Sequence, residues 1–386
     1  MCGCKWVVLS IAYISTYPPT HCGVAEYTKM LITALRSVIN ITVHILCDIN
    51  GKRETIDKEA GAYIHNVFIK GSSSYDKILD TLAEIGGVDV LHVQHEYGIF
   101  GHTDAILEAC LKAKEEKLAR KIVFTMHTVY HPLSGNDRAL KFQRKLNSVD
   151  AVIVHSFLKE FELQHQGVSP RIVYRIPHGT HLNPYLGVSR ETLLSELSLS
   201  REKIKGYIIT MPGFLRKDKG LDVLIDSLNR ISKEKFTAII AGELRDKKLL
   251  DLIEYARSNI NIIYLERYLS SEEMLKLIAL SDMIVLPYKD KRGTYSISGI
   301  LHLSMGSFRP IIGTKVPRLI ELYQYAPRLT IPPKAPEELS RKIMWLIENY
   351  DFGVAYMAYL YGYAARTQWL RMARRHVNLY NTILEH

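Results

Sequence analysis

The sequence predicts an α/β protein of two domains, each with a parallel sheet covered by helices on both faces. Short apolar runs typical of buried parallel strands alternate with segments whose apolar residues recur at helical spacing. The alternation weakens near Thr180–Lys205, which is polar and contains Pro184 and Gly187. A chain of 386 residues is also long for one domain. We therefore expect two doubly wound α/β units in tandem.

The first half is expected to carry a sheet and at least two amphipathic helices. The helix Glu26–Val38 places Tyr27, Leu31 and Leu35 on one face, and a second helix does the same around Leu107 and Leu111. The expected strands are Lys5–Ile14, Ile41–Cys47, Val88–His95, Lys121–His127, Ala151–Val154 and Ile172–Ile176.

The second half repeats the pattern after a connection at Thr180–Lys205 that includes a short helix. Ser270 and Glu273 form a capping box ahead of an apolar helix. The expected strands are Tyr207–Met211, Phe236–Ala241, Ile262–Leu265, Met283–Pro287, Pro310–Gly313 and Leu329–Ile331. We expect domains at 1–180 and 181–364, followed by a final helix at 365–386.

Composition narrows the class of protein. The apolar fraction of 47% and charged fraction of 23% are ordinary for a soluble globular protein, and no run is long and apolar enough to span a bilayer. The apolar N-terminus is better explained by a first strand than by a signal peptide, since no small-residue cleavage site follows it. The five cysteines match no zinc or disulfide framework, so we expect a reducing, cytoplasmic location.

A net charge of +10 favours anionic partners such as nucleotides, nucleic acids or anionic lipid. Nucleic-acid binding is the weakest of these hypotheses, because the chain lacks a groove-reading helix and an aromatic-basic motif. A generally basic, solvated surface is the alternative that involves no specific partner.

The stretch Met283–Thr314 is the first candidate for chemistry, because it reads as strand, loop, helix and strand. The loop contains Lys289, Lys291 and Arg292. Ser296 or Ser298 would cap the helix that follows, and Gly299 would let a ligand approach the backbone closely. Such a place, beyond the carboxyl end of a parallel strand, is suited to a phosphate or diphosphate. A surface crossover loop with incidental lysines explains this stretch equally well.

Two further turns suit an anionic or sugar ligand. Tyr17–Tyr27 contains Gly23 just before a helix, and Gly213–Gly220 contains Arg216 and Lys219 before another. Neither turn matches GxGxxG or GxxxxGK[ST], so dinucleotide binding and a P-loop are disfavoured. A Pro-rich structural turn and a solvated basic loop are the alternatives.

Polar residues also end two neighbouring strands of the first half. Gln94, His95 and Glu96 follow one strand, and His127 ends the next. They could face a cleft, and His127 could hydrogen-bond a sugar hydroxyl or transfer a proton. Structural roles in the sheet are the alternative for each. Glu243 closes a strand of the second half and is a weaker candidate.

In this order, these turns resemble those of the retaining glycosyltransferases of family 4, which have the GT-B fold. The resemblance covers essentially the full length and rests on STYPPTHCGVAEYTKML, VQHEYGIFG, FTMHTVYH, RIPHGTH, MPGFLRKDKG, IIAGE and SDMIVLPY. It implies two Rossmann-like domains facing a cleft, with the nucleotide sugar mostly on the second domain and the acceptor mostly on the first. It also implies that the last helix, near Trp369, crosses back onto the first domain.

The resemblance also implies residue roles. Lys219 matches a lysine on the donor diphosphate, and Arg216 would replace an arginine whose usual position is Phe214 here. His127 matches a histidine that contacts the transferred sugar. The implied catalytic residues are His127, Arg216 and Lys219. The implied donor-binding residues are Gly23, Phe214, Glu243, Arg292, Ser296, Ile297, Ser298 and Gly299, and the acceptor-binding residues are Gln94, His95 and Glu96.

One departure affects the donor site. The family commonly carries two glutamates in an E-x7-E arrangement, and the matching positions are Tyr295 and Leu303. A serine-rich variant branch of the family has a similar pattern. Backbone amides of 297–299 could still hold the diphosphate, while Glu243 or Glu321 could select the hydroxyls.

The expected function is therefore transfer of a hexose, with retention, from a nucleotide-diphosphate sugar to a sugar, lipid-linked or small-molecule acceptor. No metal and no cofactor beyond the sugar nucleotide are expected, because no Asp-x-Asp motif ends a strand. A non-catalytic GT-B scaffold that binds sugar nucleotides is the alternative. A side hypothesis is peripheral contact with anionic lipid at the inner face of the membrane, with a solvated helix face as its alternative. It rests on Lys112, Lys114, Lys117, Arg120 and Lys121.

Overall fold

The computed structural model describes residues 8–49 and 55–385. They form two compact units, each described by itself. Unit 1 contains the described residues up to Gly179, the segment Arg292–Ile297 and the end of the chain from Trp369. Unit 2 contains Thr180–Lys291 and Ser298–Gln368. The segment Arg292–Ile297 was not foreseen from the sequence, which predicts changes of domain only near residues 180 and 365.

Unit 1 is built on an eight-stranded sheet with the order β3-β4-β2-β1-β5-β6-β8-β9. All neighbours are parallel except β3, which runs antiparallel to β4. The strands are β1 (Leu9–Ser15), β2 (Ile41–Asp48), β3 (Ile56–Asp57), β4 (Ala62–Phe68), β5 (Val88–His95), β6 (Ala119–Met126), β8 (Ala151–Val154) and β9 (Val173–Arg175). The order reverses between β1 and β5, which is where doubly wound sheets bind ligands.

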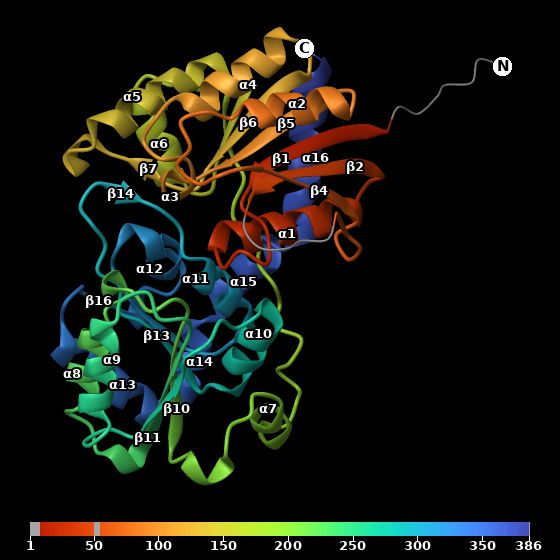
Figure 1. Cartoon of the computed structure of the whole chain (residues 1–386). Helices are drawn as coiled ribbons and strands as arrows, with labels where there is room; N and C mark the ends of the chain where they lie inside the picture. Colours follow the sequence, from red (N-terminus) through yellow and green to blue (C-terminus); the bar gives the residue numbers. More distant parts are fainter. Residues whose placement is uncertain (1–7, 50–54, 386) are drawn as a thin grey trace. The chain divides into compact units, whose positions relative to one another are not determined.

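Helices cover both faces of this sheet, as Figure 1 shows. One face packs against α1 and the final helix α16, and the other against α2, α4 and α5. The helices are α1 (Gly23–Arg36), α2 (Asp76–Glu84), α3 (Tyr97–Phe100), α4 (Ala105–Glu115), α5 (Asp137–Lys145), α6 (Phe157–His165) and α16 (Trp369–Glu385). Met372, Val377 and Tyr380 of α16 are buried in the core that α1 shares, as the periodicity of the last helix predicts.

Unit 2 has a six-stranded, all-parallel sheet with the order β12-β11-β10-β13-β15-β16. Its strands are β10 (Tyr207–Pro212), β11 (Phe236–Ala241), β12 (Ile262–Leu265), β13 (Met283–Leu286), β15 (Ile311–Thr314) and β16 (Thr330–Ile331). Because β11 and β13 are buried along their whole length, both faces of the sheet are covered. The order reverses between β10 and β13, so the loops after these two strands flank the expected ligand position.

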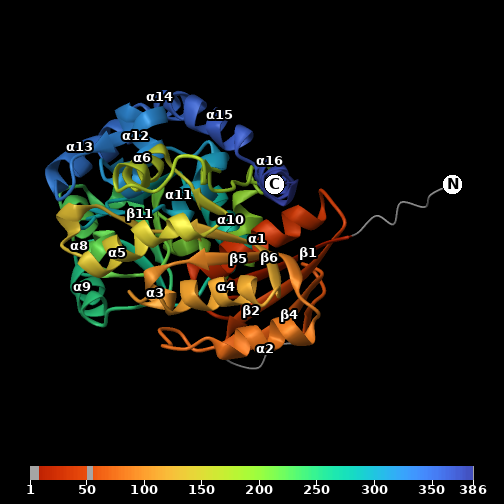
Figure 2. The ribbon, with the colours of Figure 1, turned by 90° about the horizontal axis from the view of Figure 1, so that it is seen from above.

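The helices of unit 2 share one hydrophobic core with this sheet. They are α7 (Arg190–Glu196), α8 (Leu221–Leu228), α9 (Lys248–Ala256), α10 (Ser271–Leu280), α11 (Gly299–Ser304), α12 (Ile320–Tyr325), α13 (Pro336–Glu348), α14 (Tyr350–Tyr356) and α15 (Ala358–Arg366). Figure 2 shows α13, α14 and α15 following one another along one edge of the unit. The capping box of Ser270 and Glu273 is confirmed at the start of α10.

A small two-stranded sheet in unit 1 accounts for the unforeseen segment. The strand β14 (Thr294–Tyr295) runs antiparallel to β7 (Val129–Tyr130). Gly293 precedes β14 with φ +69°, and an added Cβ would lie 2.5 Å from the backbone nitrogen of Ser134. Its carbonyl accepts the N–H of His131 at 2.9 Å. The loop that follows β13 therefore supplies a strand to unit 1.

The predicted elements can be compared with the observed ones. The prediction of mixed α/β units with parallel sheets is confirmed, although β4 was not predicted. Lys5, Trp6 and Val7 of the first predicted strand, and Cys2 and Cys4, lie outside the described residues. Within the described residues, Cys22, Cys47 and Cys110 form no disulfide bond with one another. Among the described residues, no helix is long and apolar enough to cross a membrane.

Candidate functional site

The carboxyl ends of β10, β13 and β15 bring together a cluster of charged side chains in unit 2. The Asp218 carboxylate is at its centre, where Oδ2 accepts hydrogen bonds from Nη2 of Arg216 at 2.9 Å and from Nη1 of Arg318 at 2.6 Å. Arg318 also contacts Asp290. Its backbone N–H donates to Oδ2 of Asp290 at 3.0 Å, and its side-chain Nε lies 3.1 Å from Oδ1 of the same carboxylate. Residues from three separate loops are thus held at one edge of the sheet.

Lys219 lies beside this cluster on an aromatic platform. Its Nζ is 3.8 Å from the centre of the Tyr288 ring, a cation–π arrangement. Tyr288 is completely buried, its hydroxyl is 3.2 Å from Oγ of Ser298, and its carbonyl accepts the hydroxyl of Thr314 at 2.8 Å. A ring fixed at both ends gives the ammonium group a defined position at the switch point.

The electrostatics of the cluster favour an added anion. Burial lowers the pKa of Lys219, and the positive charges of Arg318 and Arg216 contribute to the same shift. Partial burial opposes ionisation of Asp218, but the hydrogen bond from Arg318 and the charge of Arg216 outweigh it and lower the pKa. Burial raises the pKa of Asp290. Three cations with too few counter-charges would be stabilised by a bound phosphate.

Glycine 220 brings the loop after β10 against the end of β13. Gly220 has φ +76°, and an added Cβ would lie 1.9 Å from the carbonyl oxygen of Pro287. The backbone N–H of Lys289 donates to the carbonyl of Asp218 at 2.8 Å, and the Lys289 ammonium pairs with Asp222. The two basic loops predicted from sequence are therefore neighbours in space.

A second group at the same edge surrounds the end of β11. The Glu243 carboxylate pairs with Arg245 at 3.2 Å, and the Arg245 guanidinium carbon lies 4.7 Å from the centre of the Phe214 ring. The Phe214 and Tyr268 rings are 5.9 Å apart. Phe214 and Glu243, both predicted to bind the donor, are therefore linked through Arg245.

The predicted helix start in the loop after β13 is at Ser298. Its Oγ accepts the N–H of Leu301 at 3.2 Å, while Gly299 is the first residue of α11. The helix has only six residues, so its dipole can contribute little to anion binding. Arg292, Ser296 and Ile297, also predicted to bind the donor, belong to unit 1. The charged side chains of the cluster should therefore contribute more to phosphate binding than the start of this helix does.

In unit 1, His127 follows β6 and is half-buried beside Gln94. Nε2 of His127 is 3.0 Å from Oε1 of Gln94. Gln94 is buried on the same face as His92, whose ring nitrogens bond the hydroxyls of Thr125 and Tyr380, each at 2.7 Å. A hydrogen-bonded network anchored on α16 therefore positions His127.

His95 and Glu96 do not join this network. His95 is completely buried on the opposite face, where its ring stacks on Phe142 at 4.5 Å and on Phe100 at 5.6 Å. A ring enclosed by phenylalanines offers no atom to an acceptor, so the structure gives no support to that predicted role. The Glu96 carboxylate accepts the hydroxyl of Thr128 at 2.7 Å and remains at the carboxyl end of β5. Gly23 begins α1, and an added Cβ would meet no atom within 4 Å.

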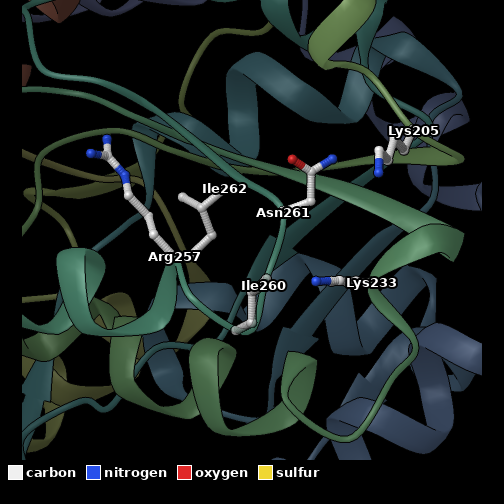
Figure 3. A pocket seen from close by; sticks show the side chains of 6 residues that line it. All are labelled: Lys205, Lys233, Arg257, Ile260, Asn261 and Ile262. Carbon is white, nitrogen blue, oxygen red and sulfur yellow. The ribbon is translucent and has the colours of Figure 1, made fainter.

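A basic pocket of about 330 Å³ lies at the opposite, amino edge of the unit 2 sheet (Figure 3). It is lined by Lys205, Lys233, Arg257, Ile260, Asn261 and Ile262. Figure 3 shows the Arg257 guanidinium pointing away from the amino groups of the two lysines, so the cations do not converge on one point. Within residues 8–49 and 55–385, no group of three or more His, Cys, Asp or Glu side chains could hold a metal ion.

Solved structures share the fold of the chain. The glycosyltransferase from Rickettsia africae ESF-5 superposes with a TM-score of 0.77 at 15% identity, covering 99% of this chain and 100% of that one. Anabaena Alr3699/HepE in complex with UDP and glucose gives 0.71 at 14% identity, covering 97% and 100%. WaaG, a glycosyltransferase involved in lipopolysaccharide biosynthesis, gives 0.66 at 14% identity, covering 96% and 99%. These likenesses show a GT-B fold of two α/β domains.

Sequence profiles match both halves of the chain. The profile described as Glycosyltransferase Family 4 matches residues 22–183, and that described as Glycosyl transferases group 1 matches residues 206–349. The chain belongs to the family 4 glycosyltransferases. No curated protein is similar enough in sequence to count as a relative.

The two positions at which the resemblance implies missing glutamates lie in different units of this glycosyltransferase. Tyr295 lies in β14, paired with β7, and Leu303 is buried in the core of unit 2. Arg318 was missed, although a basic residue shortly after the expected strand 310–313 was a usable signal. Glu321, considered from sequence as a substitute carboxylate, is only 3% exposed and lies near His302 with Oε1 3.9 Å from Nε2.

Proposed function

We propose that this glycosyltransferase transfers a hexose, with retention of configuration, from a nucleotide-diphosphate sugar to a saccharide or lipid-linked acceptor. The observation that carries the proposal is the cluster of Arg216, Lys219 and Arg318 at the switch point of the unit 2 sheet. Two arginines and a lysine provide both bidentate donors and a point charge for a diphosphate. A solved relative in fold, Alr3699/HepE, was crystallised with UDP and glucose, which agrees with this donor class.

In the proposed reaction the cluster stabilises the departing nucleoside diphosphate. Negative charge develops on the diphosphate as the bond to the sugar breaks, and fixed cations at that point lower the barrier. The acceptor hydroxyl attacks from the face that the diphosphate leaves, and a phosphate oxygen of the donor takes its proton. Because Lys219, Arg216 and Arg318 supply the positive charge, we propose that no metal ion is needed.

Nucleotide binding tests the site directly. Lys219→Met should lower the affinity for UDP by about tenfold or more, because a charged hydrogen bond to phosphate is lost. Lys233→Met, at the opposite edge of the same sheet, is the matched control and should bind UDP as the unmodified protein does. Isothermal titration calorimetry measures both. If all three proteins bind UDP with equal affinity, this cluster does not bind the diphosphate.

The reaction itself needs a separate assay. UDP-glucose and other sugar nucleotides are incubated with saccharide acceptors, and the configuration at the anomeric carbon of the product is read by NMR. We expect the donor's configuration to be kept and EDTA to leave the rate unchanged. Inverted product would contradict retention, and loss of activity in EDTA that is restored by a divalent cation would contradict metal independence.

Much of the positive charge in the segment 112–121, the basis of the hypothesis of membrane contact, is engaged in ion pairs. The carboxylate of Asp150 accepts Lys114 at 2.7 Å and lies 3.5 Å from Lys121, while Arg120 pairs with Asp89 at 2.8 Å. These pairs neutralise much of the positive charge on which the hypothesis rests. We propose a cytoplasmic protein that reaches lipid-linked acceptors without a strong electrostatic anchor. Co-sedimentation with phosphatidylserine vesicles at low salt would contradict that view.

A further inference from the structure

Two buried polar atoms in unit 1 lack a hydrogen-bond partner and lie in one aromatic cluster. They are Oη of Tyr27 and Nε2 of His155, on residues that are 2% and 1% exposed. The ring centres of Tyr27 and His155 are 5.2 Å apart, and those of Tyr27 and His127 are 4.8 Å apart. Buried polar groups are nearly always paired, so two unpaired ones in one aromatic cluster indicate a missing partner.

The cluster sits where the parallel sheet of unit 1 binds ligands. His127 follows β6, His155 follows β8, and His178 follows β9, so all three are at the carboxyl edge of the sheet. Tyr27 comes from α1, the helix that follows β1 at the switch point. His178 and Trp369 complete the ring of aromatic groups around Tyr27, at 5.0 and 5.2 Å between centres.

Hydrogen bonds to oxygen acceptors determine which ring nitrogen of each histidine carries the proton. Because a carbonyl oxygen only accepts, Nδ1 of His155 donates to Ile176 at 2.9 Å, and Nδ1 of His178 donates to Gly179 at 2.7 Å. For the same reason Nε2 of His127 donates to Oε1 of Gln94 at 3.0 Å. In the neutral ring, the other nitrogen of each histidine then carries a lone pair and can only accept.

His127 and His155 stay neutral in this setting. Burial lowers the pKa of both His127 and His155, and the positive charge of the nearby Lys159 adds to the effect. The Lys159 ammonium group donates hydrogen bonds to the carbonyl oxygens of Met126 and His127, at 3.2 and 2.7 Å. Acceptor nitrogens beside a tyrosine hydroxyl suit a ligand group that both donates and accepts hydrogen bonds, as a hydroxyl group does.

We propose that Tyr27 and His155, with the partly buried His127 beside Tyr27, form a hydroxyl-binding subsite for a saccharide. One saccharide hydroxyl would donate to Nε2 of His155 and accept from Oη of Tyr27, which satisfies both unpaired atoms at once. Gln94 is a positioning residue in this arrangement, because its amide oxygen holds the N–H of His127 on Nε2. The proposal rests on the sugar-transfer function and adds residues of unit 1 that bind the sugar.

The Tyr27→Phe variant tests whether the hydroxyl of Tyr27 contacts the ligand or only stabilises the fold. The variant removes only Oη, which has no partner in the ligand-free protein, so its melting temperature should stay the same or rise. If Oη binds the saccharide, kcat/KM for sugar transfer should fall by about tenfold, the effect of one lost hydrogen bond. The affinity for UDP, which the unit 2 cluster would bind, should not change.

The chain offers a matched control in Tyr75. Its hydroxyl is also buried and without a partner, but it packs against Phe68 and Phe100 on the other face of the sheet. Tyr75→Phe should change the melting temperature in the same direction and leave kcat/KM unchanged. The proposal fails if Tyr27→Phe keeps kcat/KM within about twofold of the unmodified protein, or if Tyr75→Phe lowers it equally.

A ligand titration keeps the two proposals distinguishable. Nitrogen-15 NMR of histidine side chains follows His127 and His155 while glucose, and separately UDP-glucose, is added to the full chain. Shifts in these signals that are absent in Tyr27→Phe support the subsite even if no transfer activity is found. If neither sugar moves the signals while UDP still binds, an ordered water is the partner of both atoms and the subsite is refuted.

Discussion

His95→Phe tests the claim that unit 1 contains histidines that must remain uncharged. His95 is completely buried against Phe100 and Phe142, neither ring nitrogen has a partner, and burial lowers its pKa from 6.5 to about 3. Between these two values the unfolded chain binds a proton that the folded chain does not. Stability is therefore full above about pH 6.5 and falls as the pH drops toward 3.

The size of the effect follows from the shift. At about pH 5 the unfolded histidine is mostly protonated, and this one residue should cost about 2 kcal/mol of unfolding free energy relative to about pH 8. The His95→Phe substitution removes this pH-dependent loss of unfolding free energy, because phenylalanine does not titrate. Any cost of fitting a larger ring is nearly independent of pH, so it cancels when the two conditions are compared.

Urea unfolding followed by circular dichroism, at about pH 8 and about pH 5, measures the difference. The unmodified protein should lose about 2 kcal/mol more than His95→Phe between the two conditions. His165→Phe, on the exposed end of α6, should behave as the unmodified protein does. If His95→Phe loses as much stability on acidification as the unmodified protein, the claim that His95 is buried and uncharged in the folded protein is wrong.

Three other substitutions test the unit 2 site. Gly220→Ala should lower the unfolding free energy by about 1–3 kcal/mol in calorimetry, because its φ is positive and its Cβ position is occupied by the Pro287 carbonyl; an unchanged melting temperature would contradict this. Tyr288→Leu should weaken UDP binding several-fold in titration calorimetry, because Lys219 loses its platform; unchanged affinity would mean that the ring plays no part. Arg318→Met should lower the unfolding free energy by about 2–4 kcal/mol at neutral pH, because the carboxylates of Asp218 and Asp290 lose their partner. That loss should shrink as the pH falls toward 4, because burial raises the pKa of Asp290 and its protonated form needs no counter-charge; a loss independent of pH would contradict it.

Much of the fold was predictable because parallel strands buried on both faces leave short apolar runs in the sequence. Val88–His95 and Phe236–Ala241 were predicted with the bounds they have in the structure. The strand Ala62–Phe68 was missed because His65 and Asn66 interrupt its apolar pattern. β14 could not be foreseen, because two residues carry no periodicity and their partner strand, β7, is far away in the sequence.

The candidate site was predictable only in part. The basic loop with Arg216 and Lys219 was identified because basic residues and glycines mark its turn. Gln94 and His95 were assigned the same role, yet neighbouring residues of a strand face opposite sides of the sheet, and His95 lies in the phenylalanine-lined core. The partnership of Tyr27 with His155 joins residues more than a hundred positions apart, and nothing local in the sequence links them.

The final helix, α16, makes unit 1 depend on the end of the chain. Its apolar face fills the core that α1 and the sheet leave open, and Tyr380 anchors His92 beneath Gln94. A ribosome delivers the N-terminal residues first, and domains usually fold in that order. Here unit 1 cannot be completed until α16, which follows unit 2 in the chain, has been made. A nascent chain paused before Trp369 would therefore expose the apolar side of α1 that α16 covers in the folded protein.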